Sequence, residues 1–202
     1  MIFLGLTGSI GMGKSATAEM FRKEGVPVYD ADAAVHELYE KGGAAVIPLS
    51  AAFPGVEEDG AINRASLRAR VLDDADAMKT LESIVHPLVG QTQLDFRQSV
   101  INSGAPLAIL DIPLLFETGG HTRCDYVLVV TASPEVQRAR VLAREGVTEE
   151  VFENILARQI PDAEKRAKAD FIISTAHGFT YAHESVQALV ALMRRKSIGD
   201  DS

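Results

Sequence analysis

The chain contains few of the residues that mark secreted, disulfide-linked or membrane-spanning proteins. It has one cysteine, Cys124, and no tryptophan in 202 residues, so no disulfide can form within the chain and a reducing compartment is expected. No uninterrupted apolar run approaches the about 20 residues that a membrane helix needs, and the N-terminus lacks the basic segment of a signal peptide. We therefore expect a cytoplasmic protein with no membrane partner, in which Cys124 has a packing role.

Basic residues are also fewer than acidic residues. Lysine and arginine number 20 against 28 aspartates and glutamates, which gives a formal net charge of −8 and an isoelectric point near 5.1. Such a balance argues against a nucleic-acid partner. The hydrophobic content of 47% is enough for a sizeable core. We expect a monomer or a weak homo-oligomer.

Short apolar, β-branched runs alternate with longer helical patterns along the chain. The runs predict buried strands at residues 2–6, 26–29, 107–110, 126–131 and 171–173, and the helical patterns predict helices at 14–23, 134–145 and 179–195. This alternation indicates an α/β fold with a parallel β-sheet core flanked by helices.

Two segments interrupt the alternation and predict additional parts. Between the second and third strands, "NRASLRARVL" begins with Asn63, a good helix cap, and "MKTLESIVHPLV" and "GQTQLDFRQSVI" continue the helical pattern. Before the fifth strand comes a charged segment whose composition favours a mobile lid. We expect a nucleotide-binding core at residues 1–31, 106–137 and 166–202, a helical substrate domain at 32–105 and a lid at 138–165.

Directly after the first strand lies the glycine-rich stretch "LTGSIGMGKSA". The spacing Gly8-(four residues)-Gly13-Lys14-Ser15 is that of a phosphate-binding loop, in which glycines allow backbone N–H groups to approach an anion. The helix that begins near Lys14 adds its positive N-terminal end. Lys14 can reach the β- and γ-phosphates, and the Ser15 hydroxyl can bind Mg²⁺. The alternative is a chance glycine-rich turn.

An acidic residue, Asp111, ends the third strand in "LAILDIP". An acid at that place can hold Mg²⁺ directly or through water; the alternative is a cap or turn aspartate. No glutamate follows Asp111, which disfavours an ATPase that activates water from that position. An Asn-Lys-x-Asp motif for reading guanine is also missing, which disfavours a GTPase switch.

The segment "VYDADAAVHELY" places Asp30 and Asp32 at the carboxyl end of the second strand, where open α/β sheets bind their ligands. Either carboxylate can accept a hydrogen bond from an attacking hydroxyl, or both simply cap the following helix. Asp32 is the better catalytic candidate and Asp30 the better cap. His36 lies four residues after Asp32 on the same helical face; a substrate contact and a structural role both remain open for His36 and for His86.

In "SPEVQRARVLAREG", a helical wheel places Gln137, Arg140 and Arg144 on one side and Arg138 roughly opposite. Positive charge on that side would stabilise the oxygens of a transferring phosphoryl group. The alternative is a surface face of ion pairs, which contributes little energy.

The motifs in this order resemble those of the dephospho-CoA kinases. The matching segments are "LTGSIGMGKS", "YDADAAVHEL", "DGAINRASL", "LESIVHPLV", "DIPLLFETG", "VQRARVLAREG" and "EKRAKADFIIS", spread over residues 1 to about 178. The resemblance implies a P-loop kinase fold and transfer of the ATP γ-phosphoryl group to the ribose 3′-hydroxyl of dephospho-CoA. It also implies that the substrate domain binds the CoA portion and that Mg²⁺ accompanies ATP.

The resemblance further implies roles for individual residues. Catalytic roles fall to Asp32, Lys14 and Arg140. ATP contacts are implied for Gly11, Met12, Gly13, Lys14, Ser15 and Ala16, and acceptor contacts for Asp32, Pro113, Leu114, Phe116 and Glu117. The residues themselves add Gly8 and Arg144 as candidate ATP contacts, Ser15 and Asp111 as candidate metal contacts, and His36 and His86 as candidate acceptor contacts.

The chain departs from the family pattern after its last strand, where the family commonly has an acid and an asparagine. Here Ser174 and Thr175 take those places in "ISTAHG", so an adenine contact through that asparagine cannot be carried over. Two other functions remain open at this point. A P-loop kinase of nucleosides or nucleotides would share the phosphate loop but would not need the Pro-Leu-Leu-Phe-Glu segment. A nucleotide-dependent binding switch would leave Asp32 and the arginine face unused.

Overall fold

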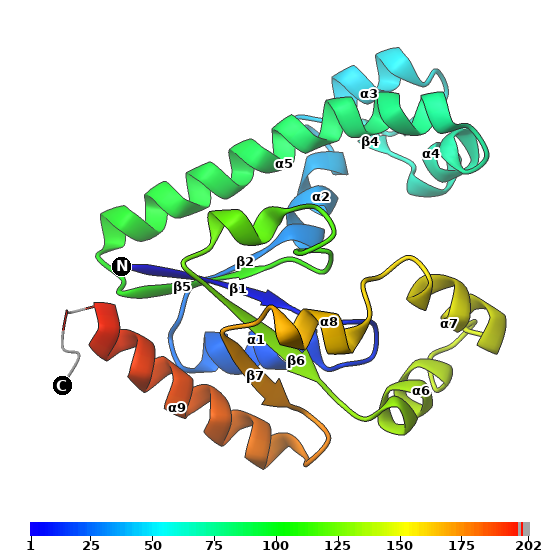
Figure 1. Cartoon of the computed structure of the whole chain (residues 1–202). Helices are drawn as coiled ribbons and strands as arrows, with labels where there is room; N and C mark the ends of the chain where they lie inside the picture. Colours follow the sequence, from blue (N-terminus) through cyan, green and yellow to red (C-terminus); the bar gives the residue numbers. More distant parts are fainter. Residues whose placement is uncertain (198, 200–202) are drawn as a thin grey trace. The chain divides into compact units, whose positions relative to one another are not determined.

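A computed structural model of the chain describes residues 1–197 and 199. The chain divides into two compact units (Figure 1): Met1–Tyr29 with the described residues from Val100 onward, and Asp30–Ser99. Among the described residues, none of the helices combines the length and the apolar character that a bilayer crossing requires.

The first unit is built on a five-stranded sheet in the order β2-β5-β1-β6-β7. Its strands are β1 (Ile2–Thr7), β2 (Val28–Asp30), β5 (Leu107–Asp111), β6 (Tyr126–Thr131) and β7 (Phe171–Ser174). The central strand β1 is buried along its whole length and pairs in parallel with β5 and β6, with Leu4 opposite Ile109 and Tyr126. The predicted parallel α/β core is confirmed, and the carboxyl ends of its strands form one edge.

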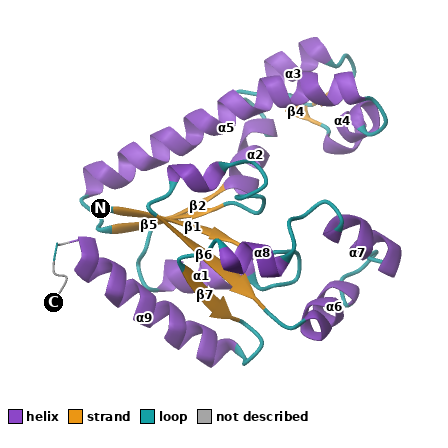
Figure 2. Cartoon of the chain, viewed as in Figure 1, coloured by secondary structure: helices purple, strands orange, loops and turns teal. Residues whose placement is uncertain are grey.

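Helices cover both faces of this sheet (Figure 2). On one face α1 (Lys14–Lys23) packs against α9 (Phe179–Ser197), around a core that includes Leu4, Leu6 and Phe21. On the other face Leu115 and Phe116 pack against Val127 and Val129 of β6. The remaining helices of this unit are α6 (Pro134–Leu142), α7 (Glu149–Leu156) and α8 (Asp162–Ala167), with a 3₁₀ turn at Gly120–Arg123.

The second unit has its own apolar core. It contains α2 (Ala31–Tyr39), α3 (Val46–Ala52), the hairpin strands β3 (Glu57–Glu58) and β4 (Ala61–Ile62), α4 (Arg64–Val71) and most of α5 (Ala75–Ser103), which continues into the first unit. Leu49 and Val56 are fully buried in this core and pack with Leu38, Leu67 and Val71.

Several element boundaries differ from the sequence prediction. The two helical patterns before β5 form one 29-residue helix, α5, with Pro87 inside it. The helix predicted at 134–145 ends at Leu142, so Arg144 lies beyond it. The second strand begins at Val28 rather than residue 26. Neither α3 nor the β3–β4 hairpin was expected, because each is too short to show a periodic pattern.

Candidate active site

The glycine loop between β1 and α1 has a backbone conformation that residues other than glycine rarely adopt. Gly11 and Gly13 have φ angles of 77° and 90°, in the left-handed region that favours glycine. A Cβ on Gly11 would lie 2.5 Å from Val141 Cγ2, and one on Gly8 would lie 2.7 Å from the Val130 carbonyl oxygen. Gly8 is therefore required by close packing against β6, and Gly11 by packing against α6 as well as by the turn, while a Cβ on Gly13 would lie 3.0 Å from Thr175 Oγ1.

Lys14 and Asp111 meet at the end of the sheet. Lys14 Nζ donates to Asp111 Oδ1 at 2.6 Å, and the two side chains are 15% and 2% exposed. Strands β1 and β5 are neighbours, so the residues that follow them meet at the same edge. The structure thus joins two predicted site residues that stand 97 positions apart. Ser15, on the first turn of α1, is exposed.

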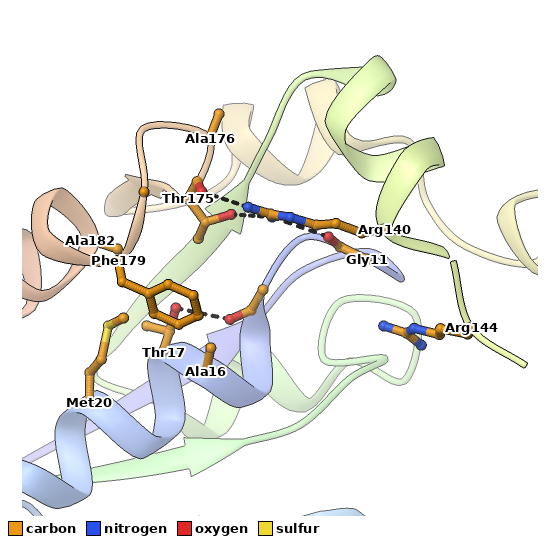
Figure 3. A pocket seen from close by; sticks show the side chains of 12 residues that line it. Gly11, Ala16, Thr17, Met20, Arg140, Arg144, Thr175, Ala176, Phe179 and Ala182 are labelled. Atoms are coloured by element: carbon orange, nitrogen blue, oxygen red, sulfur yellow. Dashed lines mark hydrogen bonds between the residues drawn. The ribbon is translucent and has the colours of Figure 1, made fainter. Parts of the chain in front are cut away.

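Arg140 and Thr175 brace the loop from the opposite side (Figure 3). The Arg140 guanidinium donates to the Thr175 hydroxyl and carbonyl, both at 2.8 Å, and more weakly to the Gly11 carbonyl at 3.4 Å. The Thr175 hydroxyl donates to the Met12 carbonyl at 2.8 Å. Because Thr175 is only 7% exposed, these contacts are shielded from solvent. The loop backbone is therefore fixed by residues from α6 and from the end of β7.

A cavity of about 350 Å³ opens beside this braced loop. Gly11, Gly13 and Ala16 line it from the loop and α1, and Arg140 and Arg144 line it from the α6 region. Thr175, Ala176, Gly178 and Phe179 also line it, and Figure 3 shows Phe179 and both arginines around the same space. The Phe179 side chain is 75% exposed and free to contact a flat ligand.

The residues of α6 divide between loop support and surface contacts. Gln137 Nε2 donates to the Ile10 carbonyl at 2.7 Å. Arg138 points elsewhere and forms an exposed ion pair with Glu149, which raises the pKa of the guanidinium further through hydrogen bonding and Coulomb attraction. Arg140 and Arg144 line one cavity, although Arg144 is not helical.

The acids after β2 have different surroundings. Asp30 caps α2, because its carboxylate accepts from the backbone N–H groups of Asp32 and Ala33 at 3.0 Å. Asp32, in the first turn of α2, has an exposed side chain. His36 is exposed and its Nε2 lies 3.2 Å from Glu40 Oε1, while His86 is exposed on α5.

Glu117, at the end of the Pro-Leu-Leu-Phe-Glu segment, is paired with a buried lysine. Lys165 of α8 is fully buried, and its Nζ lies 2.8 Å from Glu117 Oε1, which also accepts from the Ile160 N–H. Burial alone would raise the pKa of Glu117, but these donors outweigh it, so its pKa lies below the usual value. Among the described residues, the buried Glu117 Oε2 has no hydrogen-bond partner and keeps an acceptor available.

Pro113, Leu114 and Phe116 belong to the same loop after β5. The Pro113 carbonyl accepts from Thr7 Oγ1 at 2.9 Å, which ties the segment to the end of β1. Phe116 is buried, whereas Leu114 is 40% exposed. The exposed apolar side chain of Leu114 and the partly buried carboxylate of Glu117 give this loop both the apolar and the polar surface that a small-molecule site uses.

The donor set for a metal ion is small. The part of the chain that the structure describes contains no group of three or more histidine, cysteine or acidic side chains able to hold an ion. Ser15 and Asp111 nevertheless supply the hard oxygen ligands that Mg²⁺ prefers, and Mg²⁺ commonly takes the rest of its shell from water and phosphate. The residues present therefore fit a metal that arrives with a nucleotide.

Sequence reasoning missed Gln159 and Phe179 and the role of Thr175. Gln159 Oε1 accepts from the Ile10 N–H at 3.1 Å, Thr175 braces the loop, and Phe179 lines the cavity. No motif marks Gln159 or Phe179, and Thr175 was noted only as a departure from the family pattern. Their one signal was position, because Thr175 and Phe179 follow the carboxyl end of β7, where ligands of parallel sheets bind.

Comparison with known proteins identifies the same family throughout the chain. The sequence model of the family described as Dephospho-CoA kinase matches residues 2–180. The dephospho-CoA kinase of Rhodopseudomonas palustris (strain HaA2) is 55% identical over 190 residues, which cover 94% of each chain. That of Jannaschia sp. (strain CCS1) is 62% identical over 172 residues, covering 85% of this chain and 87% of the relative.

Solved structures agree with these sequence relatives. The crystal structure of TT1252 from Thermus thermophilus has a TM-score of 0.81 and 34% identity, covering 95% of this chain and 97% of that one. A dephospho-CoA kinase from Campylobacter jejuni has a TM-score of 0.67 at 22% identity, covering 95% and 96% of the two chains, and supports the fold.

The Glu117–Lys165 pair predicts acid sensitivity. Because folding lowers the pKa of Glu117, its stabilisation is present above the unfolded pKa of about 4.3 and is lost as the pH falls through the folded pKa. Glu117→Gln should lose about 3–5 kcal/mol at pH 7, since Lys165 stays buried without its counter-charge. Thermal melting followed by circular dichroism between pH 7 and about pH 3 measures both effects.

The double variant Glu117→Gln with Lys165→Met removes both charges, so it should be nearly as stable as the parent at pH 7 and lose less stability in acid. Glu19→Gln is the control, because Glu19 forms only an exposed ion pair with Arg22 at 3.5 Å. If the melting temperatures of the parent and the double variant fell equally between pH 7 and about pH 3, the Glu117–Lys165 pair would not be the source of the acid sensitivity.

Proposed function

The chain belongs to the dephospho-CoA kinase family, whose members phosphorylate dephospho-CoA to coenzyme A, and we propose which of its residues carry out the transfer. The observation that supports the assignment most directly is the glycine loop with its Lys14–Asp111 pair beside a cavity of about 350 Å³. The loop and the pair supply phosphate binding, and the cavity has room for part of a nucleotide.

In this proposal the donor ATP lies along the loop. The N–H groups of residues Gly11 to Ala16, with Gly8 allowing the turn, hold the phosphates at the N-terminus of α1. Lys14 exchanges Asp111 for the β- and γ-phosphates. The base enters the cavity, where Phe179 offers an aromatic face and Arg144 a cation. Thr175 contributes by bracing the loop rather than through the base contact of the family's usual asparagine.

Mg²⁺ is the proposed metal, held by the Ser15 hydroxyl and the Asp111 carboxylate. When bound, the ion supplies charge neutralisation on the phosphates. The protein's own part is to keep an exposed serine at the start of α1 and a buried aspartate at the end of β5.

Asp32 is the proposed partner of the acceptor hydroxyl. The 3′-oxygen of the acceptor forms a bond to the γ-phosphorus, and the bond between that phosphorus and the β,γ-bridging oxygen breaks to release ADP. The hydroxyl proton passes to Asp32. Because the transition state is loose, Asp32 contributes mainly by orienting the hydroxyl. Lys14 and Arg140 offset the negative charge on the transferring group.

The remaining assignments concern the acceptor and the lid. His36, His86 and the segment Pro113–Glu117 are proposed acceptor contacts, and the free Glu117 Oε2 is the atom that supports the last of these. Residues 32–105 serve as the acceptor domain and residues 138–165 as the lid. Residues 1–31, 106–137 and 166–202 form the nucleotide-binding core.

The activity predicts a selective response to acceptors. Purified protein with Mg-ATP should convert dephospho-CoA to coenzyme A and leave nucleosides and nucleoside monophosphates largely unphosphorylated. Liquid chromatography of the products measures this. A phosphorylated nucleotide without any coenzyme A would favour the rival P-loop kinase, and tight ATP binding without transfer to any acceptor would favour a binding switch.

Asp32→Asn should lower kcat by about 10²- to 10⁴-fold because the group that receives the proton is lost. The KM for ATP should stay within about twofold, because the proposed partner of Asp32 is the acceptor. Steady-state kinetics measure both constants. Asp30→Asn is the matched control, since asparagine caps helices as well as aspartate and α2 is kept. Unchanged turnover in Asp32→Asn would remove Asp32 from the mechanism.

Arg140→Ala should lower kcat by about 10²- to 10³-fold, because charge on the transferring group loses its partner. It should also raise the KM for ATP, since the contacts to Thr175 and Gly11 that brace the loop disappear. Arg138→Ala, on the same helix, loses only a surface ion pair with Glu149 and should behave like the parent enzyme. Equal kinetics for the two variants would contradict the role of Arg140.

A further inference from the structure

A second cavity, of about 490 Å³, lies wholly within the second unit. Its polar lining comes from Tyr39, Arg64 and Arg68, and its apolar lining includes Leu67, Val71 and Leu81. Arg64 and Arg68 stand one turn apart on α4, so they share a face of the helix. The cavity therefore combines two cations with an apolar surface.

The segment "DGAINRASL" gives the arginines a defined position. Asp59 and Gly60 have φ angles of 53° and 85° and form the tight turn between β3 and β4. Asn63 then caps α4 by accepting from the Ser66 N–H at 3.0 Å, and its amide donates to Glu58 Oε2 at 2.7 Å. Arg64 is consequently the first residue of a helix whose start is fixed by the Asn63 cap and by the bond from Asn63 to the hairpin.

The two arginines carry charge that the described part of the protein does not compensate. Across residues 1–197 and 199, no hydrogen bond or ion pair engages the guanidinium group of Arg64 or Arg68. Arg70, on the same helix, instead donates to the Pro54 carbonyl at 3.2 Å. Like charges four residues apart on a helix repel each other. An anion bound between the two guanidinium groups would attract both and offset this repulsion.

Tyr39 adds a neutral donor beside the cations. It is only 9% exposed, and its burial raises the pKa of the hydroxyl, while the nearby charge of Arg64 acts in the opposite direction. The hydroxyl therefore stays protonated near neutral pH and can donate a hydrogen bond to an anionic oxygen.

We propose that Arg64 and Arg68 bind the diphosphate of the acceptor in this cavity. The inference rests on the proposed function, because dephospho-CoA carries no other ionised group near neutral pH. Guanidinium groups bind phosphate oxygens bidentately, and Leu67, Val71 and Leu81 give the aliphatic chain next to the diphosphate an apolar surface. The cavity is thus a specificity site for acceptors that carry a diphosphate.

Kinetics with two acceptors test this assignment. Arg64→Gln and Arg68→Gln should each raise the KM for dephospho-CoA by about ten- to a hundredfold, the effect of losing a charged hydrogen bond. The KM for ATP should stay within about twofold. Adenosine has the ribose 3′-hydroxyl but no phosphate, so its kcat/KM as an acceptor, which is expected to be low in the parent, should fall no further in either variant.

Binding without turnover provides a second readout. Isothermal titration of dephospho-CoA into the full chain, with the phosphate loop saturated by a non-hydrolysable ATP analogue, should show the same weakening for Arg64→Gln and Arg68→Gln. Arg70→Gln is the matched control and should bind like the parent, because Arg70 does not line the cavity. Both cavity arginines are exposed, so thermal melting should show intact folds. Arg64→Lys, which keeps the charge, should restore part of the affinity.

The outcomes separate this inference from the proposed function. An unchanged KM and an unchanged dissociation constant for dephospho-CoA in Arg64→Gln and Arg68→Gln would overturn the cavity assignment, while coenzyme A formation by the parent upheld the activity. Equal weakening toward adenosine or toward ATP would also overturn it, because the effect would not depend on the diphosphate. A parent enzyme that forms no coenzyme A would overturn the proposed function and this inference together.

Discussion

The close packing of the glycine loop is the constraint on which the first unit depends. Gly8 lies against Val130 of β6, Gly11 against Val141 of α6, and a Cβ on Gly13 would come within 3.0 Å of the Thr175 hydroxyl. Each glycine therefore touches a different element. The loop can keep its shape only while β6, α6 and the end of β7 hold their places, so the rigid sheet itself determines where phosphate-binding N–H groups point.

The ion pair between Lys14 and Asp111 is a second constraint at this end of the sheet. Both side chains are largely buried, and Lys14 Nζ lies 2.6 Å from Asp111 Oδ1. A buried charge left without a partner would be costly. Under the proposed function, a bound triphosphate would replace one anion beside Lys14 by another, so the lysine would keep a counter-charge throughout.

Much of the first unit could be predicted from the sequence, because its strands are continuous apolar runs and its loop has a fixed spacing. The prediction was weaker where the chain contains mixed signals. The helical patterns at residues 78–89 and 90–101 did not show where each helix begins and ends, and the structure joins them into one helix, α5, that continues through Pro87 and Gly90. The apolar pattern of α6 suggested a longer helix, but it ends at Leu142 and Gly146 follows with a φ of 73°. The periodic pattern of apolar residues does not record where a helix ends, so both elements differ from the prediction in length.

The arginines illustrate why site residues are harder to predict than strands. Arg138 and Arg140 are two positions apart on α6, and Arg68 and Arg70 are two positions apart on α4, so each pair looks alike in composition. A helical wheel separates their faces but does not show what each face meets. Arg138 finds Glu149 and Arg70 finds the Pro54 carbonyl, whereas Arg140 meets the glycine loop and Arg68 an open cavity. The contacts of a surface arginine therefore depend on which neighbouring segment its helix face meets, and the helix sequence alone does not record that segment.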